Sequence, residues 1–181
     1  MIVDLGTGDG RAVLARATLD PRAFVIGIDA NAAGMVESSR RAARRRGDRR
    51  ADNAIFLVEA AEALPGLLAG TASLGTITMP WGSLLRGVLG LDLVALRGVT
   101  SIVAPGGRVE VLASVVPADR VDGITALDRT SEARIADAWQ SIGLELVSMR
   151  PATVDDLRVT RSSWARRLGD RPVWRLDLRR T

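Results

Sequence analysis

Short apolar runs rich in β-branched residues alternate along the chain with segments whose apolar positions recur every three or four residues. The short runs predict buried strands, and the spaced positions predict helices that pack against them. Strands are expected at residues 2–5, 24–28, 54–58, 74–79, 108–114, 144–149 and 173–178. Helices are expected at residues 11–17, 32–43, 84–89 and 131–142, with a turn at 105–107. This alternation is typical of an α/β fold, and we expect a single domain over residues 1–181.

The first expected strand runs directly into a turn with glycines at alternate positions. Gly6, Gly8 and Gly10 are followed at once by a helical segment. Because glycine has no Cβ, backbone N–H groups of such a turn approach a ligand closely, and the next helix begins at that ligand. The spacing G-x-G-x-G differs from the G-x-G-x-x-G fingerprint of dinucleotide-binding proteins. Residues 3–10 resemble the first motif of class I S-adenosylmethionine-dependent methyltransferases, which implies a Rossmann-like, mostly parallel seven-stranded sheet with helices on both faces.

An acidic residue stands at the end of the second expected strand. Asp29 lies 19 residues beyond Gly10. In nucleotide-binding α/β units an acid at roughly this offset binds a ribose hydroxyl. The alternative is an ordinary helix cap, and the glycine turn upstream favours the ribose ligand.

The composition removes several kinds of catalytic site. The chain has no Cys, His or Tyr. It therefore cannot form disulfides, Cys/His zinc sites, Ser-His-Asp triads or cysteine nucleophiles, and we expect no bound metal. No apolar run reaches 18 residues and no secretory signal is indicated, so we expect a cytoplasmic protein without a membrane partner.

Arginines concentrate after the second expected helix. The chain carries a net charge of +4, and all of its basic residues are arginine. Seven of them lie between positions 40 and 50, against the single acid Asp48: Arg40, Arg41, Arg44, Arg45, Arg46, Arg49 and Arg50. They could form a solvated face that complements a helix C-terminus. Because so many like charges repel one another, contact with a phosphate backbone is the preferred interpretation.

Two further strand ends are expected at the same edge of the sheet, because the carboxyl ends of parallel strands lie together. The third strand leads to Ala61 and Glu62, and this junction flanks the cofactor adenine in methyltransferase sheets. The fourth contains Thr78 and is interrupted after Met79 by residues 80–83, PWGS, which should lie beside the transferable methyl group. Methyltransferases of exocyclic amines commonly have Asn or Asp before the proline. Met79 stands there in this chain, so an amine acceptor is disfavoured.

The six aromatic residues divide into two groups. Four lie in apolar strands or on a helix stripe and are expected in the core: Phe24, Phe56, Trp139 and Trp174. Trp81 and Trp164 lie at element junctions with polar neighbours. They could simply cover the cofactor. The functional interpretation is a pair of rings that hold a flipped nucleobase by stacking.

Four motifs together carry a resemblance to one family. They are DLGTGDG at residues 4–10, AAEALP at 60–65, PWGSLLRG at 80–87 and SSWARRL at 162–168. In this combination and order, the chain resembles the aminoglycoside-resistance methyltransferases of 16S ribosomal RNA, of the kanamycin-apramycin type that methylates N1 of a decoding-site adenosine.

The resemblance implies S-adenosylmethionine as cofactor and S-adenosylhomocysteine as product. It implies that the cofactor is bound by Gly6, Thr7, Gly8, Gly10, Asp29, Ala61, Glu62 and Thr78. It implies that Trp81 and Trp164 stack on the target adenine, with Pro80, Ser83 and Ser162 shaping the catalytic pocket. The arginines of segment 40–50, together with Arg166 and Arg167, are implied to dock 16S rRNA within the assembled small (30S) subunit. We expect a monomer.

The chain departs from the family pattern in two places. The family usually has an N-terminal β-hairpin before the first strand, and Met1 leaves no room for one. Met79 stands where an aromatic residue often precedes the Pro-Trp pair. Three alternatives remain: a guanine-N7 16S rRNA methyltransferase, a small-molecule methyltransferase, and a non-catalytic RNA-binding protein that retains the fold.

Overall fold

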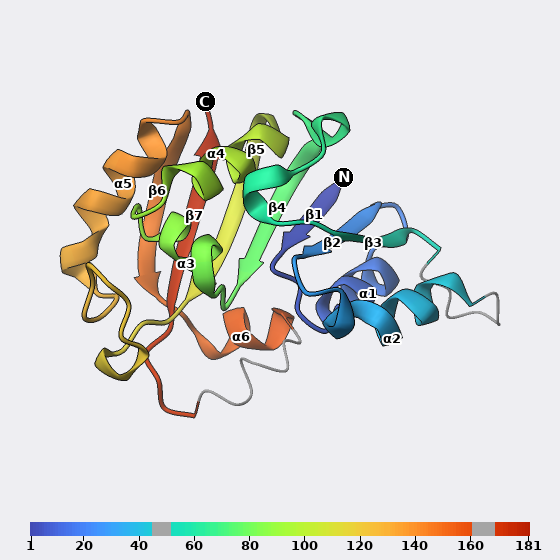
Figure 1. Ribbon diagram of the computed structural model, residues 1–181, viewed down its shortest axis with the longest axis horizontal. Helices are drawn as coiled ribbons and strands as arrows, with labels where there is room; N and C mark the ends of the chain where they lie inside the picture. Colours follow the sequence, from blue (N-terminus) through green and yellow to red (C-terminus); the bar gives the residue numbers. More distant parts are fainter. Residues whose placement is uncertain (45–51, 161–168) are drawn as a thin grey trace.

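A computed structural model describes residues 1–44, 52–160 and 169–181, which build a mixed sheet (Figure 1). The sheet has seven strands in the order β3-β2-β1-β4-β5-β7-β6. The strands are β1 (Ile2–Leu5), β2 (Val25–Asp29), β3 (Ala54–Val58), β4 (Ala72–Thr78), β5 (Val103–Ala113), β6 (Leu144–Pro151) and β7 (Trp174–Arg180). Neighbours among β1–β5 are parallel, whereas β7 runs antiparallel to both β5 and β6. The expected mostly parallel sheet is confirmed.

Helices pack on both faces of this sheet because successive side chains of a strand point to opposite faces. Val3 and Leu5 of β1 join a core cluster with residues of α3, α4 and α5, while Ile2 joins a second cluster with Val13 of α1. Figure 1 shows α1 and α2 beside β1–β3, α3 and α4 over the middle of β4–β7, and α5 beside β6 at the left edge. The helices are α1 (Arg11–Leu19), α2 (Ala32–Ala43), α3 (Gly82–Val88), α4 (Leu93–Ile102), α5 (Glu132–Gln140) and α6 (Val154–Thr160).

The structure corrects three expectations. The turn expected at residues 105–107 lies inside β5, where the register against β4 shifts and Gly106 adopts a φ of +72°. Pairing with β4 on both sides of this irregularity keeps the segment within the strand. Phe24 is 41% exposed and lies outside the core, because it precedes the first residue of β2. Helices α4 and α6 were not expected from the sequence pattern. Among the described residues, no helix has the length and apolar character needed to cross a membrane.

Candidate functional site

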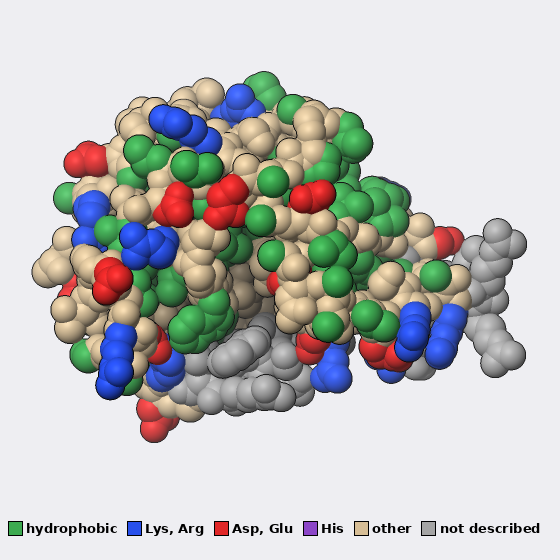
Figure 2. Space-filling view, viewed as in Figure 1, with side chains coloured by type: hydrophobic (Ala, Val, Ile, Leu, Met, Phe, Trp, Pro, Cys, Tyr) green, Lys and Arg blue, Asp and Glu red, His purple; other side chains and the backbone are tan. Residues whose placement is uncertain are grey.

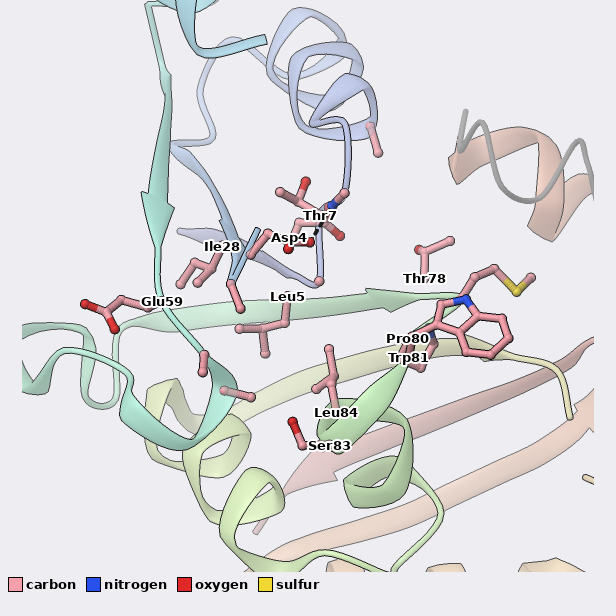
Figure 3. Close-up of a pocket in the computed structure, with 18 of the residues that line it drawn as sticks. Asp4, Leu5, Thr7, Ile28, Glu59, Thr78, Pro80, Trp81, Ser83 and Leu84 are labelled. Atoms are coloured by element: carbon pink, nitrogen blue, oxygen red, sulfur yellow. Dashed lines mark hydrogen bonds between the residues drawn. The ribbon is translucent and has the colours of Figure 1, made fainter. Parts of the chain in front are cut away.

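A cavity of about 250 Å³ lies at the carboxyl ends of β1, β2 and β4 (Figure 3). Parallel strands of an α/β sheet place ligand sites at this edge. The lining residues come from the three strand ends and from the loops and helix starts that surround them. They are Asp4, Leu5, Gly6, Thr7, Gly8, Asp9, Ala12, Ile28, Asp29, Ala30, Glu59, Ala60, Ala61, Glu62, Thr78, Met79, Pro80, Trp81, Ser83 and Leu84.

The glycine turn forms one wall of the cavity. Gly6, Gly8 and Gly10 have φ values of +70°, +59° and +70°, a region that favours glycine over all other residues. A Cβ on Gly8 would meet no atom within 4 Å, so this position opens onto free space. Gly10 is absent from the cavity lining and is instead the N-cap of α1, where its missing Cβ makes room for the ring of Phe56. We conclude that Gly10 shapes the turn.

Asp29 connects this turn to the start of α2. Its Oδ2 accepts a hydrogen bond of 2.8 Å from Gly8 N, and its Oδ1 accepts one of 2.8 Å from Asn31 N. The N-cap of α2 is Asn31, whose side chain accepts from Ala33 N at 3.1 Å. The alternative that Asp29 is the helix cap is therefore wrong. Each carboxylate oxygen has further lone pairs with which to accept a ligand hydroxyl.

Asp4 is a buried acid that sequence reasoning did not assign to the site. Only 7% of it is exposed, and its Oδ1 accepts a hydrogen bond of 2.6 Å from Thr76 Oγ1. Burial raises the pKa of Asp4 above its ordinary value, and the Thr76 hydrogen bond partly opposes that rise. A charged residue inside the apolar run of the first strand was the available signal.

The segment after β3 forms the opposite wall. Glu59 N donates to Asp29 O at 3.2 Å, which ties this segment to the end of β2. A short 3-10 helix, η1 (Ala61–Ala63), follows, and its first hydrogen bond runs from Ala63 N to Ala60 O at 3.0 Å. The N–H groups of Ala61 and Glu62 precede that bond, so the turn itself leaves them available to a ligand.

The loop between β4 and α3 closes the third side. Figure 3 shows Pro80 and Trp81 at the end of β4, on the other side of the cavity from Glu59. Met79 has a φ of +52°, rare for a residue with a side chain, and its N–H donates to Leu112 O at 2.7 Å. This conformation turns the chain sharply before Trp81, which is 49% exposed. Ser83 and Pro80 line the cavity beside it.

The structure thus brings together the predicted residues Gly6, Thr7, Gly8, Asp29, Ala61, Glu62, Thr78, Pro80, Trp81 and Ser83 at one cavity. Ser162 and Trp164 lie outside the described residues, as do Arg166 and Arg167. The role of those four residues stays a prediction.

Part of the predicted RNA-binding segment is described. Arg40 and Arg41 lie in the last turn of α2, and Arg44 follows as its C-cap. All three are exposed, and Arg41 pairs with Glu37 at 3.3 Å. Figure 2 shows basic side chains grouped over α2. Arg45, Arg46, Arg49 and Arg50 lie outside the described residues.

Known proteins similar to this chain share one activity in their names. Residues 1–173 match the family model NpmA, described as 16S rRNA (adenine(1408)-N(1))-methyltransferase. The 16S rRNA (adenine(1408)-N(1))-methyltransferase of Streptoalloteichus tenebrarius is 32% identical over 174 residues, which is 93% of this chain and 80% of the relative.

Solved structures agree in fold over nearly the whole chain. A mutant of the 16S rRNA (adenine(1408)-N(1))-methyltransferase from Catenulisporales acidiphilia, crystallised with cosubstrate SAM, superimposes with a TM-score of 0.88 at 30% identity, covering 99% of this chain and 85% of that one. The aminoglycoside resistance methyltransferase NpmB1 gives a TM-score of 0.81 at 36% identity, with coverage of 99% and 86%. The expected class I methyltransferase fold is therefore confirmed.

Proposed function

Because this chain belongs to the family of 16S rRNA (adenine(1408)-N(1))-methyltransferases, we propose that its cavity holds S-adenosylmethionine beside an adenine of 16S rRNA. The chain is an rRNA methyltransferase that acts on N1 of this adenine, an activity that confers aminoglycoside resistance. The observation that carries the proposal is a single cavity lined by both the glycine turn and the Pro80–Trp81 loop.

The lining of the cavity fits this cofactor. Gly8 leaves open space where a Cβ would stand, so a ligand can lie against the turn. The acids Asp9, Asp29, Glu59 and Glu62 also line the cavity. S-adenosylmethionine carries a sulfonium and an ammonium charge against a single carboxylate, and an acidic lining attracts a ligand with this net positive charge. A relative of this chain was crystallised with SAM.

We assign the cofactor contacts to two walls. Gly6, Thr7, Gly8 and Asp29 would hold the ribose and methionine parts, with Asp29 accepting ribose hydroxyls. Ala61 and Glu62 would flank the adenine, because both line the cavity from η1, the short helix that follows β3. Thr78 would lie toward the acceptor side, since Figure 3 places it near Pro80 and Trp81. Gly10 would contribute to cofactor binding indirectly, by shaping the glycine turn.

The chemistry needs alignment more than acid or base catalysis. N1 of adenine carries an unprotonated lone pair near pH 7, so no general base is needed to make it nucleophilic. When bound, S-adenosylmethionine supplies a methyl group on a sulfonium sulfur, and S-adenosylhomocysteine is left as the product. The N–C bond forms as the C–S bond breaks, and the positive charge moves to the base. Holding nitrogen, carbon and sulfur in line can contribute up to roughly 7–11 kcal/mol.

We assign binding of the target adenine, which accepts the methyl group, to Trp81 and Trp164. Trp81 is half exposed beside the cavity, where it can stack on an adenine extruded from the RNA. Pro80, Ser83 and Ser162 would shape the pocket around it. The arginines of segment 40–50, with Arg166 and Arg167, would dock the RNA of the assembled 30S subunit to a monomeric enzyme.

Methyl transfer from labelled S-adenosylmethionine tests this proposal. The enzyme should label 30S subunits strongly, and free 16S rRNA or 50S subunits far less. Label on 50S subunits alone, or on small molecules alone, would reject 16S rRNA as the substrate. Binding to 30S subunits without transfer of label would support the alternative of a non-catalytic RNA-binding protein.

A further inference from the structure

Two helical glycines lie against the loops that form opposite walls of the cavity. A Cβ on Gly98 of α4 would stand 1.7 Å from the carbonyl oxygen of Ala61 and 2.8 Å from its carbonyl carbon. A Cβ on Gly34 of α2 would stand 2.8 Å from the carbonyl oxygen of Gly8. Glycine weakens a helix relative to alanine, so its presence inside two helices calls for a reason.

We infer that Gly98 and Gly34 are positioning residues of the cofactor site. Each lets a helix approach the carbonyl side of a loop so closely that the loop can take only one orientation. The inference rests on the proposed function, because it assumes that the cavity between the two loops binds S-adenosylmethionine. Neither glycine lines the cavity, so both would act through the backbone of other residues.

The contact at Gly98 orients a peptide group at the expected adenine wall. The carbonyl of Ala61 points toward α4, and since the peptide is planar and trans, the N–H of Glu62 points away from α4. This N–H is one of those that η1 leaves without a partner in its own turn. The close approach of α4 therefore leaves the donor side of the peptide to the ligand.

Core packing and capping fix the position of helix α4, so a clash at position 98 should move the loop and not the helix. Leu96, Val99 and Ile102 are at most 1% exposed and belong to the main core cluster. Asp92 caps the helix by accepting from Val94 N at 3.0 Å and Ala95 N at 3.2 Å. A side chain at position 98 would consequently displace Ala61 and Glu62.

The contact at Gly34 acts on the glycine turn in the same way. One helical turn later on α2, Ser38 Oγ donates to Asp9 O at 2.5 Å. Helix α2 therefore binds the carbonyl group of Asp9 by a hydrogen bond and packs closely against that of Gly8. The planar peptide between these residues then directs the N–H of Asp9, a residue of the cavity lining, away from α2.

Alanine substitutions test the inference, with Gly66→Ala as the matched control. Gly66 lies in a 3-10 helix of the same β3–β4 connection, and a Cβ there would meet nothing within 4 Å. Titration calorimetry with S-adenosylmethionine measures affinity, and circular dichroism checks folding. Steady-state methylation gives KM for the cofactor and for 30S subunits separately.

Gly98→Ala should raise Kd and KM for S-adenosylmethionine at least tenfold while KM for 30S subunits stays within twofold. Gly34→Ala should raise both cofactor constants about threefold or more, because its clash is milder, and Gly66→Ala should match the unaltered enzyme. A folded Gly98→Ala enzyme with unaltered cofactor affinity would overturn the inference. Should Gly98→Ala fail to fold, unaltered affinity in Gly34→Ala overturns it instead. An unaltered enzyme that gives no heat with S-adenosylmethionine would reject the proposed function itself, and the inference with it.

Discussion

Asp29 shows at the scale of one residue how a turn that lines the cavity is joined to the start of a helix behind it. Its carboxylate accepts from Gly8 N in the glycine turn and from Asn31 N at the start of α2. Hydrogen bonds to a charged acceptor contribute about 1.5–3 kcal/mol each. The same side chain is proposed to bind the ribose, so preparing the site and recognising the cofactor would depend on one carboxylate.

Asp29→Asn should raise the Kd for S-adenosylmethionine at least tenfold. An amide has one acceptor oxygen, so its NH₂ group must face either the Gly8 or the Asn31 donor. Calorimetry measures the affinity. Asp20→Asn is the control. The side chain of Asp20, like that of Asp29, accepts a hydrogen bond from a backbone N–H, that of Arg22 at 3.2 Å, but Asp20 lies outside the cavity lining. Equal affinities in Asp29→Asn and the unaltered enzyme would refute the role.

Trp81→Ala should lower kcat/KM for 30S subunits by roughly 10- to 100-fold, since stacking on a base contributes about 1–3 kcal/mol. The Kd for S-adenosylmethionine should change less than twofold, and Trp81→Phe should retain much of the activity. A parallel decrease of cofactor affinity in Trp81→Ala would instead make Trp81 a cover over the cofactor.

At the scale of elements, α6 is fixed to the sheet by an ionic cluster around one acid. Asp156, whose side chain is 9% exposed, pairs with Arg150 at 2.7 Å and with Arg175 at 3.0 Å. Thr153 N donates to the same carboxylate at 2.7 Å. The Arg150 hydrogen bond is the main cause that holds the pKa of Asp156 far below its usual range. Leu157 of α6 also packs against the small core cluster that contains Met79, so this helix supports the loop before Trp81.

The lowered pKa predicts a loss of stability in acid. A carboxylate with a depressed folded-state pKa contributes fully above its unfolded value, near pH 4, and progressively less as the pH falls toward the folded value. Urea unfolding at pH 7 and pH 3 measures the effect. The difference in unfolding free energy between the unaltered protein and Asp156→Asn should shrink by about 1 kcal/mol between these pH values. A difference that does not change with pH would contradict this role of Asp156.

Some elements could not be predicted from the sequence because their patterns are ambiguous. In α4, apolar residues occur all round the helix, and a short apolar run does not distinguish a buried helix from a strand. Residues 105–107 have the composition of a turn, but pairing of β5 with β4 on either side makes them a strand irregularity. Phe24 begins an apolar run in sequence, yet it lies beyond the paired part of β2.

At the scale of the whole molecule, the sequence was sufficient to locate the cavity. Glycines after one strand and Asp29 after the next must meet, because parallel strands bring their carboxyl ends to one edge. The contribution of Asp4, Gly34 and Gly98 could not be predicted in this way. It depends on burial and on the approach of helices to loops distant in sequence, as α4 approaches η1.

The basic C-terminal end of α2 is predicted to contact 16S rRNA when the enzyme docks on the 30S subunit. Arg40→Glu combined with Arg44→Glu should weaken binding to 30S subunits and reduce its salt dependence, by about one unit of log–log slope for each phosphate group that is no longer neutralised. Binding measured from about 50 to 200 mM salt tests this. Arg22→Glu is the control, an exposed arginine before β2, at the strand ends opposite the cavity. Equal salt slopes in the double variant and the unaltered enzyme would remove these arginines from the interface.

Primer extension on 30S subunits incubated with enzyme and S-adenosylmethionine tests most directly whether the enzyme methylates N1 of an adenine in 16S rRNA. N1 lies on the base-pairing edge, so its methylation should stop reverse transcriptase at the decoding-site adenosine only when both enzyme and cofactor are present. Full readthrough at that adenosine, with label nevertheless transferred to the RNA, would contradict the claim and indicate another position such as guanine N7.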